Sequence, residues 1–281
     1  SESDGEQVKQ AVDSLMDSFG AIDERIHAGD SAGKSYDEVA TQIDEAIAQL
    51  DAAAALEPDD RRTQVLLGRA HRGAGRLEDS VAALRRAVEL DPGYARARVE
   101  LALSQIESRR ASEARAGLEE GLARHPEDLD LRVQLARVMA ATGELDASRR
   151  ELEAVVSSDP EQAGARLALG TMLLEAGAAA EAEEHLARAL ETEAGDDTYA
   201  LGHYQLARLA AGRGDGEVAR RHLTTAIDLA PTMIPARLAL GEAELASGRA
   251  DEAAAHFAAA AEMRPDLPMP RLGEARALLL A

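Results

Sequence analysis

Cysteine is absent from this 281-residue chain, and so are tryptophan and asparagine. Without cysteine the chain forms no disulfide bond, no zinc–thiolate site and no thiol nucleophile. Aromatic residues are scarce, and the phenylalanines are only Phe19 and Phe257. Lysine is nearly missing as well, with Lys9 and Lys34 alone, so arginine supplies almost every positive charge.

The chain also lacks an excess of positive charge, since its formal net charge is −21. This charge argues against general binding to nucleic acid or to an anionic membrane. No stretch approaches 18 consecutive apolar residues, so we expect no membrane span. We expect a soluble protein of the cytoplasm or the periplasm, and the sequence does not choose between them.

The few prolines stand at regular intervals. Pro58, Pro92, Pro126 and Pro160 follow one another every 34 residues. Position 194 breaks the series with alanine, and Pro231 and Pro265 then resume the same spacing. A fixed period of this length indicates stacked copies of one small unit rather than a single globular core.

Other columns keep the same phase as the prolines. Each unit carries, in one register, a large residue followed by a small one: Leu67-Gly68, Leu101-Ala102, Leu135-Ala136, Leu169-Gly170, Leu206-Ala207 and Leu240-Gly241. A small, a large and again a small residue follow 12, 16 and 19 positions later, as in Ser80, Leu84 and Ala87. Both halves show helical spacing of apolar residues, and a glycine separates them in five of six units. Each unit therefore predicts two helices that cross where a side chain is small.

This pattern resembles the tetratricopeptide repeat family, whose 34-residue helix–turn–helix units carry the same columns and a closing proline. The resemblance implies an all-α fold, a right-handed superhelix (α-solenoid) of antiparallel helix pairs with six to seven repeats. We expect an N-terminal capping helix and loop at 1–35, a repeat array at 36–267 and a C-terminal capping helix at 268–281. A three-residue insertion falls near 194–199. From the style of the sequence we expect a bacterial protein.

The resemblance also implies a binding site, because in this family the first helix of each repeat lines a concave groove. The groove positions carry apolar residues at Val65, Val99, Leu103, Val133, Leu167, Tyr204 and Leu238. They also carry arginines at Arg69, Arg72, Arg137 and Arg208. Apolar burial would supply binding energy, and the arginines would favour an acidic segment. Family members that bind chaperone tails use lysine and asparagine at such positions, and these repeats have neither.

We therefore expect a non-catalytic scaffold or adaptor that binds a protein or peptide segment in this groove, as an assembly factor of a larger complex. The alternative is a self-assembling structural protein, a homo-oligomer joined through helices at 5–28 and 268–281. Repeat proteins of this kind occur in both roles, and no motif in the chain decides between them.

An enzyme or metal protein is a third interpretation, suggested by histidines at one position of three successive repeats, His185, His222 and His256. Neighbouring repeats lie about 10 Å apart because of helix packing, whereas zinc needs its ligands about 2 Å away. We expect surface histidines, no metal site and no cofactor. No nucleophile motif stands out, so we expect no catalytic residue.

Overall fold

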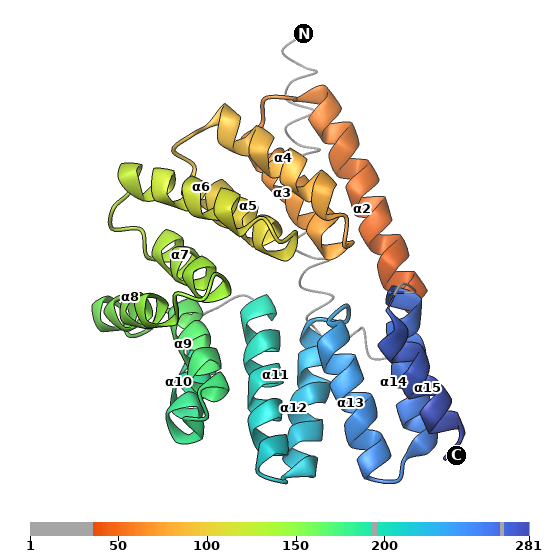
Figure 1. Cartoon of the computed structure of the whole chain (residues 1–281). Helices are drawn as coiled ribbons and strands as arrows, with labels where there is room; N and C mark the ends of the chain where they lie inside the picture. Colours follow the sequence, from red (N-terminus) through yellow and green to blue (C-terminus); the bar gives the residue numbers. More distant parts are fainter. Residues whose placement is uncertain (1–35, 193–195, 265–266, 281) are drawn as a thin grey trace. The chain divides into compact units, whose positions relative to one another are not determined.

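The structure is a computed structural model that describes residues 36–192, 196–264 and 267–280. All regular structure in these residues is α-helical, in the helices α2 to α15 (Figure 1). The predicted capping helix and loop at 1–35 lie outside the described residues. Part of the predicted insertion, residues 193–195, lies outside them as well.

Successive helices follow the predicted repeats closely. After α2 (Tyr36–Leu56) come α3 (Arg61–Gly73), α4 (Leu77–Leu90), α5 (Ala95–Glu107), α6 (Ala111–Arg124), α7 (Leu129–Ala141), α8 (Leu145–Ser158), α9 (Ala163–Glu175), α10 (Ala179–Glu191), α11 (Asp196–Gly212), α12 (Gly216–Leu229), α13 (Ile234–Ala246), α14 (Ala250–Met263) and α15 (Pro268–Leu278). The odd-numbered helices from α3 to α13 are the first helices of the repeats, and the even-numbered ones are the second. The first helix of the fifth repeat, α11, has 17 residues, whereas α9 and α13 have 13 each.

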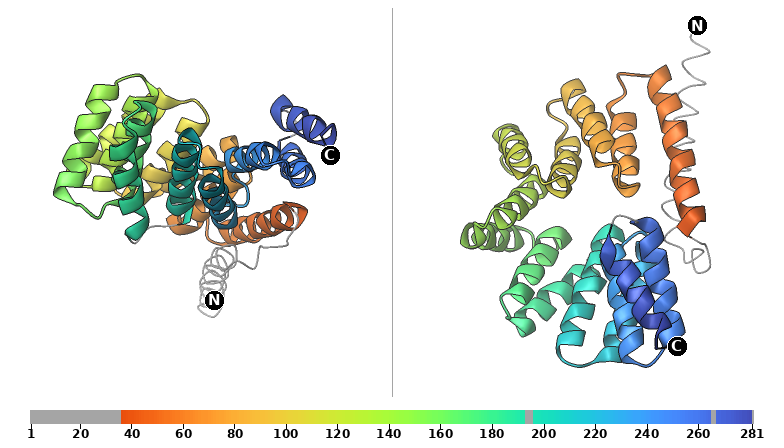
Figure 2. Two further views of the ribbon diagram at one scale, coloured as in Figure 1. Left: turned by 90° about the horizontal axis from the view of Figure 1, so that it is seen from below. Right: turned by 45° about the vertical axis from the view of Figure 1, so that its right-hand side comes forward.

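The chain divides into two compact units, and the boundary in the repeat array falls between Ala168 and Leu169, inside α9. In the first unit, consecutive helices from α3 to α8 pack on one another, and the first helices α3, α5 and α7 also pack side by side (Figure 2). In the second unit, consecutive helices from α10 to α15 pack in the same way, and α13 packs against α15. Each unit is therefore a short solenoid built from neighbour contacts.

The crossing of the two helices in a repeat is as tight as the sequence columns predict. A Cβ atom added to Gly68 would stand 2.4 Å from Cγ of Leu84, which is itself fully buried. Gly170 meets Leu186 in the same way, with 2.8 Å between its added Cβ and Cγ of Leu186. A larger residue at either glycine would force the helices apart, and overpacking of this kind typically costs about 1–3 kcal/mol.

Phe257 replaces leucine at this crossing in the last full repeat. Its ring is 2% exposed and lies between Gly241 of α13 and Gly273 of α15. A Cβ at Gly273 would stand 2.5 Å from a ring carbon of Phe257. The helix in the predicted C-terminal segment is thus seated on α14 through a glycine that accommodates the ring.

An arginine near the start of three first helices, α5, α9 and α13, links its repeat to the one before it. Arg98, which is 4% exposed, donates from Nε to the carbonyl oxygen of Pro92 at 3.0 Å and from Nη1 to that of Gly117 at 3.0 Å. The same bond to the preceding closing proline recurs from Arg166 to Pro160 and from Arg237 to Pro231. These arginines therefore tie the start of a first helix to the end of the repeat before it.

Ion pairs on the surface join the second helix of one repeat to the start of the second helix of the next repeat. Asp44 pairs with Arg76, Glu78 with Arg110, and Glu217 with Arg249, each pair separated by 32 residues. The acids of these pairs are mostly exposed and the arginines partly exposed, so each pair contributes about 0–1 kcal/mol. They reinforce the stacking rather than create it.

The turn between the two helices needs one residue with a left-handed backbone. Five repeats place glycine there, for example Gly75 with φ +73° and Gly143 with φ +89°. The second repeat has Arg109 at this position, with φ 60°. The amide of Arg110 still donates to the carbonyl of Gln105 at 2.7 Å, as in the glycine turns. Arg109 therefore holds a conformation that costs a non-glycine residue about 1–2 kcal/mol.

We predict that Arg109→Gly raises the free energy of unfolding by about 0.5–1 kcal/mol. The glycine removes the left-handed strain, but its greater conformational entropy in the unfolded chain offsets part of that stabilisation. The thermal midpoint followed by circular dichroism measures the change. Arg109→Ala is the matched control, since it removes the same side chain but keeps the strain. Equal midpoints for the two variants would contradict the prediction.

Candidate functional site

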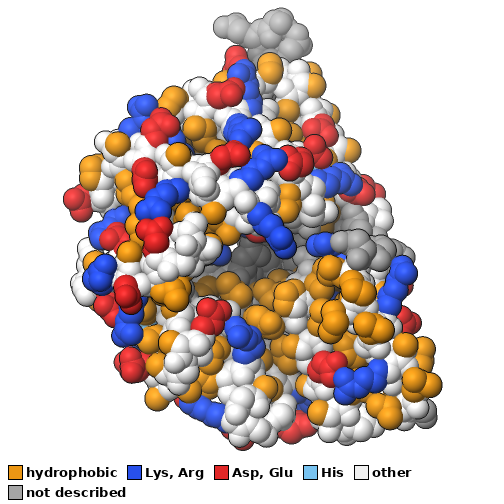
Figure 3. Space-filling model, viewed as in Figure 1, with side chains coloured by type: hydrophobic (Ala, Val, Ile, Leu, Met, Phe, Trp, Pro, Cys, Tyr) orange, Lys and Arg blue, Asp and Glu red, His pale blue; other side chains and the backbone are white. Residues whose placement is uncertain are grey.

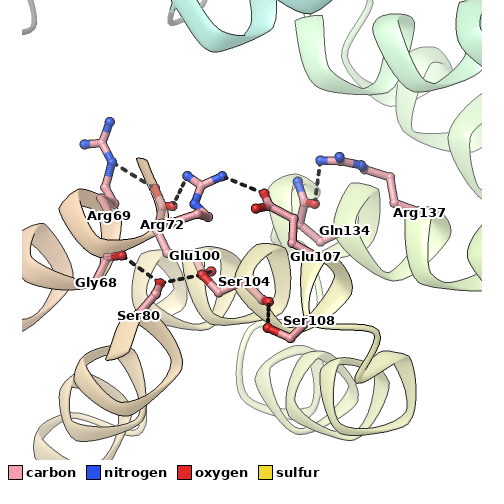
Figure 4. A network of polar contacts seen from close by, with 10 residues as sticks. All are labelled: Gly68, Arg69, Arg72, Ser80, Glu100, Ser104, Glu107, Ser108, Gln134 and Arg137. Atoms are coloured by element: carbon pink, nitrogen blue, oxygen red, sulfur yellow. Dashed lines mark hydrogen bonds and ion pairs between the residues drawn. The ribbon is translucent and has the colours of Figure 1, made fainter. Parts of the chain in front are cut away.

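The first helices of the first unit carry a row of charged side chains that links α3 to α5 (Figure 4). Nη2 of Arg72 lies 3.0 Å from Oε2 of Glu100, and Nε of Arg69 lies 3.5 Å from Oε1 of the same carboxylate. Nη1 of Arg72 also lies 3.4 Å from Oε1 of Glu107. Glu100 is buried, and the two arginines are partly buried. Two of the predicted groove arginines are therefore brought together, and both already share a carboxylate.

A buried chain of serine hydroxyls supports this row from below (Figure 4). Oγ of Ser80 donates to the carbonyl of Gly68 at 2.7 Å and lies 2.8 Å from Oγ of Ser104. Ser104 stands on α5 one turn after Glu100, and its hydroxyl lies 3.2 Å from the Glu100 carbonyl. The chain joins α3, α4 and α5, so the helices that carry Arg72 and Glu100 hold a fixed spacing.

Arg137 on α7 differs from the other two arginines of this row. Its Nη1 donates to Oε1 of Gln134 at 3.0 Å. Among the described residues, no carboxylate forms an ion pair with Arg137. Burial and the positive charge of Arg72 lower the pKa of Arg137, and only Glu107 acts in the opposite direction. The guanidinium stays charged at neutral pH, but its charge is incompletely compensated, so an added anion would stabilise it.

The predicted apolar residues of this unit are used largely for packing between repeats. Val65, Val133 and Leu167 are 3%, 1% and 7% exposed. Val65 belongs to a cluster with Val81, Leu84 and Leu101 from the neighbouring helices. Val99 and Leu103 on α5 are half-buried. The apolar area that this face offers a partner is therefore smaller than the sequence columns suggest.

The predicted residues of the second unit lie on α11 and α13. Tyr204 is half-buried against the cluster of Ala207 and Leu223, and Leu238 packs beside the Phe257 cluster. Nη1 of Arg208 donates to Oε1 of Gln205 at 2.8 Å, and Arg208 is exposed. This glutamine–arginine pair repeats the arrangement of Gln134 and Arg137 in the first unit.

The two carboxylates of the charged row were not among the predicted site residues. Glu100 and Glu107 lie in the first helix of the second repeat, 28 and 35 residues after Arg72. The alignment of the repeats could have pointed to Glu100, because the equivalent residues in the other first helices and in α15 are uncharged: Leu66, Gln134, Ala168, Gln205, Ala239 and Gly273. A lone acid in an otherwise uncharged column indicates a specific partner.

Hydrophobic side chains gather on the second unit, over α13 and α15, while charges of both signs alternate over the first unit (Figure 3). On and just after α15, five large apolar residues are more than half exposed: Met269, Leu272, Leu278, Leu279 and Leu280. Gly273 on the same helix faces Phe257 and is covered. One side of α15 is thus packed, and another is apolar and exposed.

Comparison of the sequence with known families gives one consistent result. Two profiles, both described as Tetratricopeptide repeat, match the chain, one at residues 72–125 and 106–163 and the other at residues 39–95 and 204–268. The matched regions extend together over 39–163 and 204–268, which is more than half of the chain. No curated protein matches the chain in sequence.

Solved structures confirm the predicted fold class, an all-α superhelix of helix pairs. A chain of the APC/C hetero-tetramer Cut9–Hcn1 matches 82% of this chain with a TM-score of 0.61 and 14% identity, and this chain spans 45% of that one. TTC0263, a thermophilic TPR protein of Thermus thermophilus, matches over 65% of this chain and 97% of its own length, with a TM-score of 0.54 and 26% identity. Within the described residues, no helix has the length and hydropathy needed to cross a membrane.

We predict that Glu100→Gln lowers the free energy of unfolding by about 1–2 kcal/mol, because it leaves Arg69 and Arg72 without their shared carboxylate in a partly buried place. Glu78→Gln is the matched control, since it breaks an ion pair of Glu78 with Arg110 in which the carboxylate is 74% exposed. The control should cost less than about 1 kcal/mol. Thermal midpoints at low salt test both, and equal losses would show that the Glu100 pairs are no stronger than a surface pair.

Proposed function

The chain belongs to the tetratricopeptide repeat family, and we propose that it is a non-catalytic scaffold that binds an acidic segment of a partner protein on the face of its first helices. A family of this architecture offers an extended surface for protein interaction, which supports the scaffold class in general. The identity of the bound segment and a role as assembly factor of a larger complex are part of the proposal.

The incompletely compensated charge of Arg137 is the observation that carries the proposal. Arg69 and Arg72 contribute less free charge than their number suggests, because Glu100 and Glu107 compensate them. Within the described part of the chain, the hydrogen-bond acceptor of Arg137 is the neutral oxygen of Gln134. A carboxylate from a partner would bind the remaining donors of the guanidinium, and such charge-assisted bonds are about twice as strong as neutral ones.

The chemistry of the partner segment follows from the neighbours of this arginine. Half-buried Val99 and Leu103 on the adjacent first helix α5 offer a limited apolar surface. The charge of Arg72 acts on Arg137, but Glu100 and Glu107 pair with Arg72, so Arg137 is the main positive charge offered to a partner. We therefore propose a segment with at least one aspartate or glutamate for Arg137 and an apolar residue beside it. In the second unit, Arg208 with Gln205 offers an equivalent anchor of its own. Tyr204 stands one turn before it on α11, and Leu238 lies on the next first helix, α13.

The binding test begins with capture of partners from native cells, followed by affinity measurements between the purified partner and variants of this chain. Arg137→Glu should weaken binding roughly tenfold to several hundredfold, because it replaces an attraction by a repulsion within a partly dry site. Fluorescence anisotropy at two salt concentrations measures the affinity. The wild-type affinity should fall as salt rises.

Arg149→Glu provides the matched control for this experiment. Arg149 is exposed on the second helix α8 and pairs with Glu153 of the same helix, so the substitution changes the net charge equally but leaves the first-helix face intact. If Arg137→Glu and Arg149→Glu bind the partner equally well, the partner does not bind at Arg137 and the groove assignment is wrong.

Self-assembly through the terminal helices is the second candidate function, and the exposed apolar residues of α15 favour it. Met269 and Leu272 are 62% and 64% exposed, and Leu279 is 86% exposed. Large apolar side chains exposed together on one helix commonly mark an interaction site when they form a patch. The other predicted contact, at 5–28, lies outside the described residues.

Sedimentation of the purified protein over a range of concentrations tests this candidate. Self-assembly predicts a mass that rises with concentration and returns to the monomer in Leu272→Glu with Leu279→Glu. Leu145→Glu is the control, because Leu145 is 56% exposed on α8 and lies far from α15 in the sequence. A monomer at every concentration excludes self-assembly and leaves the scaffold proposal unaffected.

A further inference from the structure

Two histidines of the fifth repeat face each other across its pair of helices. Nδ1 of His203, on α11, lies 2.9 Å from Nδ1 of His222, on α12. The ring centroids are 5.2 Å apart and the ring planes are inclined by 34°. The centroids are hardly farther apart than this distance plus the two ring radii, so both Nδ1 atoms lie close to the line that joins the rings. The two nitrogens therefore face each other directly, as in a hydrogen bond in which one Nδ1–H donates and the other Nδ1 accepts.

The repeat register shows that this pair is a local departure from the pattern. The residues equivalent to His203 are arginines in four other first helices and in α15: Arg98, Arg132, Arg166, Arg237 and Arg271. Elsewhere the position of His222 meets that arginine, as in the ion pair of Arg132 with Glu151. In the sixth repeat the two positions hold Arg237 and His256, and the positive charge of Arg237 adds to burial in lowering the pKa of His256. Of these repeats, only the fifth combines two imidazoles.

Both imidazoles are suited to act as ligands at neutral pH. Burial lowers the pKa of His203, and the nearby His222 lowers it further. Burial and the charge of Arg221 lower the pKa of His222. Neutral imidazole is the form that binds metal ions. Both side chains are half-buried, so solvent can reach the pair and supply further ligands.

We propose that His203 and His222 form a two-imidazole binding site for a divalent transition-metal ion such as Zn²⁺, Ni²⁺ or Cu²⁺. Metal–nitrogen bonds of about 2.0–2.1 Å place two imidazole nitrogens on one ion about 2.9–3.4 Å apart, for bond angles between a right angle and the tetrahedral value. The observed 2.9 Å lies at the start of this range. Binding would require the shared Nδ1 proton to move to Nε2 and both rings to turn, so that the two Nδ1 lone pairs meet on the ion. Imidazole suits all three of these ions.

Solvent would complete the coordination of the ion. Across the part of the chain that the structure describes, no group of three or more histidine, aspartate and glutamate side chains is placed to hold a metal. The site therefore differs from a closed structural zinc site, which has four protein ligands. It would bind an ion reversibly and clamp α11 to α12 in the repeat that also has the lengthened first helix.

This site also differs from the one that the sequence suggested and then disfavoured. The sequence aligned His222 with His185 and His256, one repeat away on either side. The ligand partner of His222 is instead in the same repeat, on the first helix. His203 was not recognised because it occupies a column that holds arginine in most of the other helices.

Calorimetric titration of the full chain with Zn²⁺ and with Ni²⁺ tests the proposal. The wild type should bind one ion per chain, and binding should weaken as the pH falls, because protons compete for the same nitrogens. His203→Arg should weaken binding at least about tenfold, since it removes one of two protein ligands. This variant restores the residue of the other repeats, so it is expected to fold. His222→Gln tests the second ligand independently.

His256→Gln is the matched control, since it removes a histidine at the same position of the next repeat and should bind like the wild type. A nitrogen hyperfine signature of two imidazoles in the Cu²⁺ electron paramagnetic resonance spectrum, lost in His203→Arg, would support the assignment. The proposal is overturned if the wild type binds no stoichiometric ion. It is equally overturned if His203→Arg and His222→Gln bind as tightly as His256→Gln, because the ion then lies elsewhere.

Discussion

The close approach of the two helices in each repeat is the constraint on which the rest of this structure depends. A glycine or alanine on the first helix leaves room for one large side chain of the second, and that side chain is then fully buried, as Leu84, Leu118 and Leu152 are. Neither helix alone can bury its apolar stripe, so the contact also creates a surface that the next repeat must cover. The phase of the small and large residues therefore determines where every later side chain lies.

Much of the fold could be predicted because these contacts repeat with the period of the sequence. The columns placed helix pairs over the described part of the chain, and the glycine turns and closing prolines marked their ends. The exception at Arg109 is instructive. The left-handed turn persists there without glycine because the surrounding contacts fix the backbone more strongly than one residue resists it. A sequence search for turn residues alone finds five of these six turns.

The binding surface was harder to predict because its properties come from pairs of residues that occupy different columns. Arg69 and Arg72 look like a positive patch in the register, yet Glu100 on the next first helix compensates them. Val65 and Val133 look like exposed apolar residues and are buried by neighbouring helices. Likewise, the contact between His203 and His222 joins two columns that the register treats separately. Alignment by period predicts which residues are equivalent, but only the packing shows which of them meet.

The ion pairs between successive second helices have a consequence for how such a chain can grow. The acid and the arginine of each pair, as in Asp44 with Arg76 and Glu78 with Arg110, occupy the same two positions of adjoining repeats. One repeat can therefore carry the acid for its successor and the arginine for its predecessor. A gene segment that encodes such a repeat, copied in tandem, yields a unit that already matches both of its new neighbours. Array length can thus change by duplication without any new contact having to evolve first.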